Sequence, residues 1–145
     1  MGPGSAGTIQ GNDVIDNVWA PAAIDNPAAA ASGILIFAAR SVNVTSNIVG
    51  NNQFGIAAES SDAGVADGAL IRGNAVFGTR IFDGIELCSN INTVSNNTIS
   101  GSGEAGIHLD SRCASPGNGN RVSRNLINEA CAGILVSTGT SGNST

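Results

Sequence analysis

The sequence predicts an all-β solenoid, that is, a stack of similar coils built from short strands. Apolar and polar residues alternate at a period of two, which is typical of strands. The same pattern also recurs along the chain, most clearly in Asn92–Asp110, where turns separate three short strands. None of these strands can bury its apolar face alone, so stacked copies are needed.

Five segments fit one template that is centred on an asparagine. In each segment an aliphatic residue stands three positions before the asparagine and another stands two positions after it. The template asparagines are Asn12, Asn47, Asn74, Asn97 and Asn125. A Gly-Ile pair also recurs, at Gly33, Gly55, Gly84, Gly106 and Gly133. The repeat therefore predicts about five coils whose interior is filled by stacked aliphatic side chains.

The repeated asparagine predicts a ladder along the axis of the stack. The turn between two closely packed strands needs a left-handed backbone, which asparagine tolerates better than other residues except glycine. Its side-chain amide can also hydrogen-bond to the same amide in the coils above and below. We therefore expect these five asparagines to have a structural role.

The repeat resembles that of the right-handed parallel β-helix proteins, the pectate-lyase-like superfamily, and within it the NosD-like repeat class. The resemblance covers about Thr8 to Ser137. It implies a single-stranded right-handed parallel β-helix and an involvement with polysaccharide. The family's catalytic signatures are missing, because the chain has no Lys or Tyr for the chemistry of alginate lyases and epimerases. It also lacks the Arg-x-Pro-x-x-Arg of pectate lyases and the Gly-His-Gly of polygalacturonases.

The predicted organisation is one domain with short ends. Residues 1–7 are expected to be a flexible lead, residues 8–137 the β-helix domain, and residues 138–145 a flexible polar tail. Residues 17–32 interrupt the repeat with two prolines and an alanine run. This segment is interpreted either as an extended connection or as a cap in which Trp19 covers an exposed coil.

Composition and charge exclude several classes of protein. The formal net charge is −5, and the six basic residues are all arginines spread along the chain. Binding to nucleic acid through a basic surface is therefore disfavoured. No apolar run approaches the ~20 residues of a membrane span. We expect an extracellular or cell-surface protein, although no signal peptide is visible in the sequence.

The candidate site lies on the strand that follows the Gly-Ile pair. If the isoleucines point inward, the neighbouring residues point outward and stack at about 4.8 Å from coil to coil. Glu86 should then lie beside His108, the sole histidine, in an acidic patch that includes Glu59 and Asp110. Arg112 follows just beyond this patch.

This patch allows three interpretations. Glu86, His108 and Asp110 can act as general acids and bases, with Glu59 and Arg112 binding the ligand. The same carboxylates and imidazole can instead hold a divalent cation such as calcium, or a sugar. The third interpretation is a solvated sheet face with no function. No cofactor is otherwise expected.

The three cysteines lack the close spacing of a zinc site. If one disulfide forms, the predicted pair is Cys88 and Cys113, because Cys88 ends its strand at the edge from which the loop Ser111–Gly119 emerges one coil later. The alternative is three reduced thiols with Cys131 buried as a small apolar residue.

Two functions therefore remain open. The first is a carbohydrate-binding or carbohydrate-processing module, which as an enzyme would be a polysaccharide lyase, hydrolase or epimerase. The second is a structural protein whose coils stack end to end into a fibre or filament. The expected partner is a polysaccharide or further copies of the chain, as a homo-oligomer.

Overall fold

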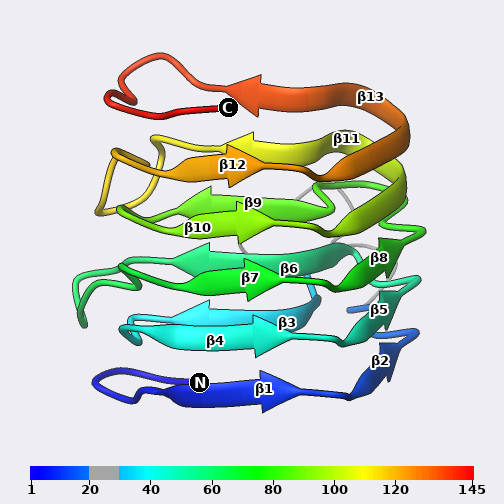
Figure 1. Cartoon of the computed structure of the whole chain (residues 1–145). Helices are drawn as coiled ribbons and strands as arrows, with labels where there is room; N and C mark the ends of the chain where they lie inside the picture. Colours follow the sequence, from blue (N-terminus) through cyan, green and yellow to red (C-terminus); the bar gives the residue numbers. More distant parts are fainter. Residues whose placement is uncertain (20–29) are drawn as a thin grey trace.

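The computed structural model describes residues 1–19 and 30–145, and it forms a parallel β-helix. In Figure 1 the strands at the front run to the right, those behind run to the left, and the chain rises with each turn, which makes the helix right-handed. All pairs between the named strands are parallel. The predicted fold class is confirmed.

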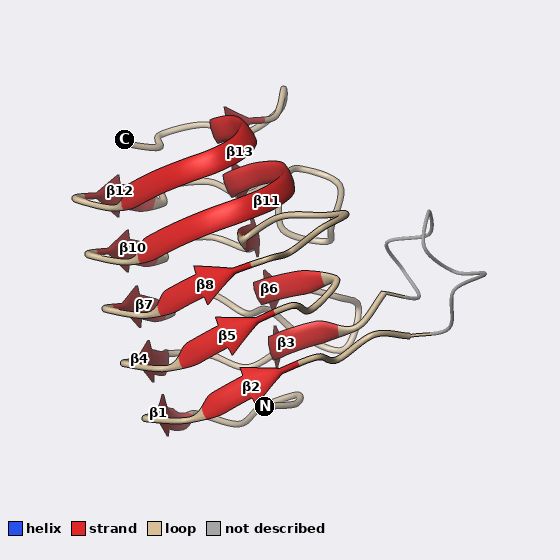
Figure 2. Cartoon of the chain, turned by 90° about the vertical axis from the view of Figure 1, so that its right-hand side faces the viewer, coloured by secondary structure: helices blue, strands red, loops and turns tan. Residues whose placement is uncertain are grey.

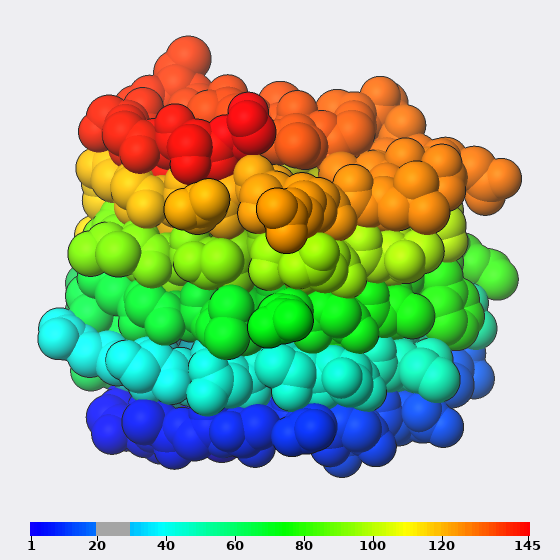
Figure 3. All heavy atoms as spheres, in the orientation of Figure 1, coloured from blue at the N-terminus to red at the C-terminus, as the bar shows by residue number. Residues whose placement is uncertain are grey.

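One face of the helix is a five-stranded sheet with one strand from each coil. Its strands, in spatial order, are β1 (Gly7–Gln10), β4 (Val42–Thr45), β7 (Leu70–Arg72), β10 (Thr93–Ser95) and β12 (Arg121–Ser123). This sheet is at the front in Figure 1, and in Figure 3 the coils that contain it appear as successive bands of colour.

The other two faces are joined by long strands that turn the corner between them. The second face contains β2 (Asp13–Ile15), β5 (Ile48–Gly50) and β8 (Ala75–Phe77). The third face contains β3 (Ser32–Phe37), β6 (Phe54–Glu59) and β9 (Ile85–Cys88). The strands β11 (Thr98–Leu109) and β13 (Leu126–Val136) pair along both faces, with a register shift at the corner (Figure 2).

The aliphatic residues of the repeat stack in register and fill the interior. On the first face Ile9, Val44, Ile71, Val94 and Val122 form one column. On the second face Val14, Val49, Val76, Ile99 and Ile127 form another. The isoleucines of the Gly-Ile pairs form the third: Ile34, Ile56, Ile85, Ile107 and Ile134. Most of these side chains are fully buried, so apolar burial stabilises the stack.

The glycine that precedes each of the first four isoleucines is required because the neighbouring atoms leave no room for a Cβ, whereas a Cβ on Gly133 would have nothing within 4 Å. A Cβ built on Gly55 would lie 2.2 Å from the carbonyl oxygen of Gly84, and one on Gly84 would lie 2.7 Å from that of Gly106. The coils therefore approach too closely here for any side chain. This explains why the Gly-Ile pair recurs at the start of the third face.

The template asparagines form a continuous hydrogen-bonded row. Each amide donates to the Oδ1 of the next, from Asn12 through Asn47, Asn74 and Asn97 to Asn125, at 2.9–3.0 Å. The expectation that these asparagines are left-handed is wrong. The residue before each one has the positive φ instead: Gly11, Ser46, Gly73, Asn96 and Arg124, at 54–67°.

Both ends of the chain are hydrogen-bonded to the outer coils, although residues 1–7 and 138–145 were expected to be flexible. Met1 pairs with β3, donating to Leu35 and accepting from Phe37. In the tail, Asn143 accepts from the backbone of Asn120, which extends a second asparagine row that the repeat analysis did not predict. These segments thus continue the backbone pairing at each end.

Much of the expected insertion 17–32 lies outside the described residues. At its edges, the backbone amides of Trp19 and Ala31 both donate to the side-chain oxygen of Gln53 at 2.8 Å. The side chain of Trp19 is 61% exposed. It does not cover a coil in the way that the cap hypothesis requires.

Candidate functional site

The predicted outward column on the third face is present. Ala57, Glu86 and His108 are neighbours in register across β6, β9 and β11, and Glu59 is level with Cys88. The interpretation of this column as a solvated face is wrong, because the side chains are covered. His108 is 2% exposed and Asp110 is 1% exposed. Charged groups this deeply buried need partners.

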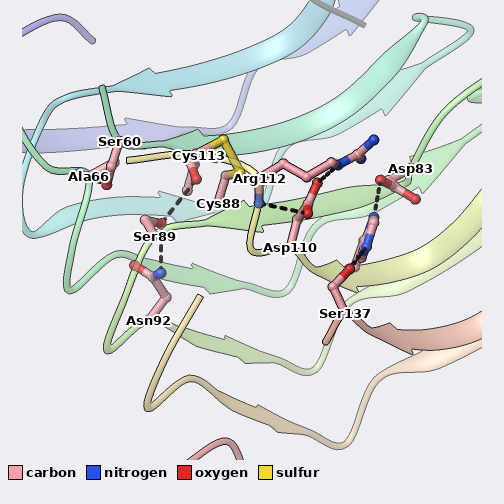
Figure 4. The surroundings of a disulfide bond; sticks show 12 residues. Ser60, Ala66, Asp83, Cys88, Ser89, Asn92, Asp110, Arg112, Cys113 and Ser137 are labelled. Carbon is pink, nitrogen blue, oxygen red and sulfur yellow. Dashed lines mark hydrogen bonds and ion pairs between the residues drawn. A yellow bond between two sulfur atoms is a disulfide. The ribbon is translucent and has the colours of Figure 1, made fainter. Parts of the chain in front are cut away.

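The loop after β11 supplies part of the cover. Cys113 in this loop forms a disulfide with Cys88 at the end of β9, with a Cα–Cα distance of 5.4 Å (Figure 4). Arg112 in the same loop donates from Nε to the Oδ2 of Asp110 at 2.6 Å. Cys131 is a free, exposed cysteine, so the alternative of three reduced thiols with Cys131 buried is also wrong.

Glu86 and Asp110 have opposite protonation tendencies. Burial is the main reason that the pKa of Glu86 is raised to about 9, and nearby carboxylates together with a hydrogen bond to Asp110 add to the effect. Burial also acts to raise the pKa of Asp110, but the hydrogen bonds and charge of Arg112 outweigh it, and that pKa is lowered. At neutral pH Glu86 is therefore protonated and Asp110 is ionised, which is the arrangement of an acid–base pair.

A second group is centred on the ring of His108. Its Nδ1 lies 3.0 Å from the Oδ2 of Asp83, and its Nε2 lies 2.9 Å from the Oγ of Ser137. The Oδ1 of Asp83 accepts a hydrogen bond of 2.9 Å from the backbone amide of Ala105. In Figure 4 the labelled Asp83 and Ser137 lie at the two ends of the dashed lines that run through the imidazole.

The surroundings of His108 favour the imidazolium. Burial by itself lowers the pKa of His108, but the hydrogen bond and charge of Asp83 act in the opposite direction. The charges of Asp110 and Glu104 add to this, so the pKa of His108 is raised above 6.5.

Two clusters in the described part of the chain have the residue types of a metal site. In the first, one ligand atom from each of Asp83, Glu104 and His108 lies within 4.8 Å of the others. The second cluster contains Glu86, Cys88 and Asp110. Because Cys88 is in the disulfide, it has no thiolate to offer, and the first cluster is the better donor set.

Sequence reasoning identified Glu86, His108 and Asp110 but missed Asp83, Glu104 and Ser137. Asp83 immediately precedes a Gly-Ile pair, a position to which the sequence analysis assigned no role. Ser137, the last residue of the predicted β-helix domain, was likewise given no role. Glu59 is half-buried, and Arg112 binds Asp110, so neither of the two expected binding residues reaches His108 through a hydrogen bond in the described residues.

A family model described as the periplasmic copper-binding protein NosD matches residues 4–145. The chain belongs to the NosD family. The resemblance to the NosD-like repeat class is thereby confirmed. The family's periplasmic description agrees with the expected location outside the cytoplasm, whereas its copper-binding description differs from the expectation of no cofactor.

The comparisons with curated proteins and with solved structures found no match. Within residues 1–19 and 30–145 there is no helix with the length and apolar character needed to cross a membrane.

Proposed function

We propose that this NosD-family protein binds copper(II) through Asp83, Glu104 and His108. The observation that carries the proposal is the convergence of these three side chains, whose ligand atoms lie within 4.8 Å of one another. The family description as copper-binding supports the choice of metal. Calcium, the ion that the sequence suggested, is a poorer fit because it prefers oxygen ligands alone.

The donor set suits the oxidised form of copper. An imidazole nitrogen with carboxylate oxygens is typical of copper(II), which binds such sites more tightly than other divalent first-row metals. Copper(I) prefers thiolate and thioether sulfur. Neither cluster in the described residues offers a free thiolate, since Cys88 is paired with Cys113.

The hydrogen bonds of the site also fit metal binding. With the Nδ1 of His108 bound to a metal, its Nε2 carries the proton and donates to the Oγ of Ser137, 2.9 Å away. Metal-binding histidines commonly donate their second ring N–H in this way, and the contact fixes the orientation of the ring. The metal would replace the proton shared between Nδ1 and Asp83.

Calorimetric titration of the purified protein with copper(II) tests the proposal, with electron paramagnetic resonance to identify the ligands. We expect one copper per chain and hyperfine coupling to one imidazole nitrogen. His108→Gln should weaken binding by more than about 100-fold, beyond the 10–100-fold typical of outer-sphere changes. Cys131→Ala, which removes the exposed thiol, should bind like the wild type. Binding that survives His108→Gln but is lost in Cys131→Ala would refute the proposed site.

A second candidate function, binding of acidic polysaccharide, is favoured by a different face. Two adjacent grooves on the five-stranded sheet share Asn96 and are lined by Arg72, Arg121 and Arg124 together with hydroxyl side chains. No carboxylate lines either groove, and none of these arginines forms an ion pair among the described residues. Unpaired guanidinium groups are suited to the carboxylates of uronic acids.

Retention on immobilised polygalacturonate, with neutral dextran as the control, tests this second function. The wild type should be retained in a salt-dependent manner, because exposed charges are screened by salt. The double variant Arg72→Ala, Arg121→Ala should lose retention, whereas His108→Gln should keep it. Equal retention on both resins would exclude recognition of acidic sugar.

A further inference from the structure

Asp83, His108 and Ser137 form a hydrogen-bonded row, and the copper site uses the Ser137 hydroxyl only to orient the imidazole ring. We propose that Ser137 is a nucleophile, activated by His108, that hydrolyses neutral carboxylic esters when the metal is absent. The two distances that carry the proposal are 2.9 Å from Ser137 Oγ to His108 Nε2 and 3.0 Å from Nδ1 to Asp83 Oδ2. A nucleophile, its base and a third group that orients the base are the elements of serine-based catalysis.

The orientation of the ring is fixed from the Asp83 side. The Oδ1 of Asp83 is held by the backbone amide of Ala105 at 2.9 Å, which leaves Oδ2 to accept a hydrogen bond from Nδ1–H. In the neutral ring, which forms at pH values above the raised pKa of His108, the lone pair is then on Nε2, where it accepts the hydroxyl proton of Ser137. Asp83 is thus a positioning residue.

The three side chains differ in solvent exposure, and a nucleophilic site needs this difference: the base is covered and the nucleophile can be reached. Asp83 and His108 are 0% and 2% exposed, so water does not compete for their hydrogen bond. Ser137, which directly follows β13, is half-buried and so more exposed than the other two groups. A substrate can therefore approach the Oγ while the base stays covered.

The reaction follows from these positions. The Oγ of Ser137 attacks the ester carbonyl carbon, and its proton passes to Nε2 of His108. The bond between the carbonyl carbon and the alcohol oxygen then breaks, and the alcohol leaves with that proton. Water next attacks the acyl-serine, giving one proton to His108, and the carboxylic acid leaves as that proton returns to Ser137. No oxidant or further reactant is needed.

The charge of the surroundings selects the class of substrate. Asp83 and Glu104 each place a carboxylate oxygen within 4.8 Å of a ring nitrogen of His108, whereas the charge of Asp110 is paired with Arg112. These negative charges repel an anionic substrate such as a phosphate ester. A neutral carboxylic ester has no charge to be repelled.

The proposal does not depend on the copper site, although the two share His108 and Asp83. Ester hydrolysis needs the tautomer with the proton on Nδ1, whereas the metal form described above has the proton on Nε2. Only hydrolysis needs the hydroxyl of Ser137 as a reacting group. Ser137→Ala therefore separates the two functions.

The experiment uses the full chain freed of metal by a chelator. Phenylmethylsulfonyl fluoride labelling is followed by mass spectrometry, in parallel with hydrolysis of 4-nitrophenyl acetate. We expect one label per chain on Ser137 in the wild type and in Ser61→Ala, which removes a serine in another surface loop. Ser137→Ala should be unlabelled and inactive, yet still bind one copper(II) per chain, with an affinity weakened by no more than the roughly 10–100-fold typical of an outer-sphere change. Asp83→Asn should lower the labelling rate by about 100-fold or more, because it imposes the wrong tautomer.

Labels spread over surface serines, or ester hydrolysis unchanged in Ser137→Ala, would overturn the proposal. So would an unchanged labelling rate in a folded Asp83→Asn variant. Because Asp83 is buried, thermal unfolding must first show that this variant is folded. If it is not, the comparison of the wild type with Ser137→Ala decides the question alone. Loss of copper binding in His108→Gln with no labelling of Ser137 would leave the proposed function standing and remove only this activity.

Discussion

The Nδ1 of His108 lies 3.0 Å from the Oδ2 of Asp83, although 25 positions separate these residues in the sequence. The separation is about the length of one coil, and so is the 29 positions from His108 to Ser137. Three successive coils thus contribute one side chain each, and the stacking of the coils sets the distances between them. Any change in that stacking changes the site.

The pair of His108 and Asp83 gives the first prediction. Since the pKa of His108 is raised, NMR titration of this sole histidine should give a value above ~6.5. Asp83→Asn removes the negative charge and should lower the measured pKa. A wild-type value at or below ~6.5 would contradict the hydrogen-bonded geometry.

The same shift predicts how this pair affects stability. A histidine whose pKa is higher in the folded state than in the unfolded state binds more protons, on average, when the protein is folded. The contribution of His108 to the free energy of unfolding is therefore fully present below about pH 6.5, the pKa of an unperturbed histidine. It is lost as the pH rises through the pKa of the folded state.

Glu86 gives the second prediction, and here too stability should fall as the pH rises. Its pKa is about 9 in the folded protein against 4.5 ordinarily, so the folded state holds the extra proton. Stability should fall as the pH rises from about 5 to 9. Glu86→Gln mimics the neutral form, and we expect it to unfold at a higher temperature than the wild type at pH 8 but at a similar one at pH 4. The expected gain is on the order of 1–3 kcal/mol. If the unfolding temperatures of the two proteins changed with pH in the same way, Glu86 would have to be ionised in the folded protein.

The sequence predicted the interior of this protein well. The three aliphatic columns, the Gly-Ile pairs and the register of Glu86 with His108 all follow from a repeat in which equivalent positions must stack. Identical spacing around each asparagine indicates identical backbone, so the repeat alone determines which residues become neighbours. The left-handed residue was assigned one position too late, because the preceding position varies between Gly, Ser, Asn and Arg, whereas the asparagine is the same in every coil.

The parts that break the repeat could not be predicted in this way. The acidic patch is buried rather than solvated, partly because the loop after β11 is tied across it by Arg112 and by Cys113. The course of such a loop depends on these individual contacts and not on a period. Asp83 was missed for a related reason, since the position before each Gly-Ile pair carries a different residue in most coils. The one sequence feature that indicated a role for Asp83 was its acidic side chain directly before a Gly-Ile pair.

The asparagine row gives the third prediction. In Asn97→Ala, both Asn74 donors and the carbonyl of Ile71 lose their partner in a buried position. We expect a loss of about 2–3 kcal/mol from unpaired polar groups, without the backbone strain that a left-handed residue would add. Chemical denaturation measures it, with the exposed Asn128→Ala as the matched control. An equal effect in both variants would mean that the row contributes nothing.

The disulfide gives the fourth prediction. The Cys88–Cys113 bond closes a segment of 25 residues, which should stabilise the protein by roughly 3 kcal/mol. Thiol titration in denaturant should therefore find one free thiol per chain, that of Cys131. The double variant Cys88→Ala, Cys113→Ala should unfold at a lower temperature than Cys131→Ala. Three titratable thiols in the oxidised protein would exclude the bond.

The fifth prediction joins the two proposed uses of His108. Copper(II) on Nδ1 places the proton on Nε2, so the hydroxyl of Ser137 loses its acceptor. Saturating copper(II) should therefore slow the labelling of Ser137 by at least about tenfold. Cys131→Ala is used throughout, so that the free thiol binds no metal. Labelling that continues unchanged while one copper is bound would place the copper elsewhere.

The coil-by-coil origin of the site has a consequence for how such a centre can arise or be moved. At the level of His108, neighbouring coils carry Ala57, Glu86 and Leu135 on the same outward column. Duplication of one whole coil between Asp83 and His108 would preserve the β-helix and yet separate the acid from the imidazole. Conversely, three substitutions at the equivalent positions, each one coil closer to the N-terminus, would rebuild the same group of side chains on the same fold. In this architecture a site depends on which coils are adjacent. A change in the number of coils can therefore create or remove a site while the fold is kept.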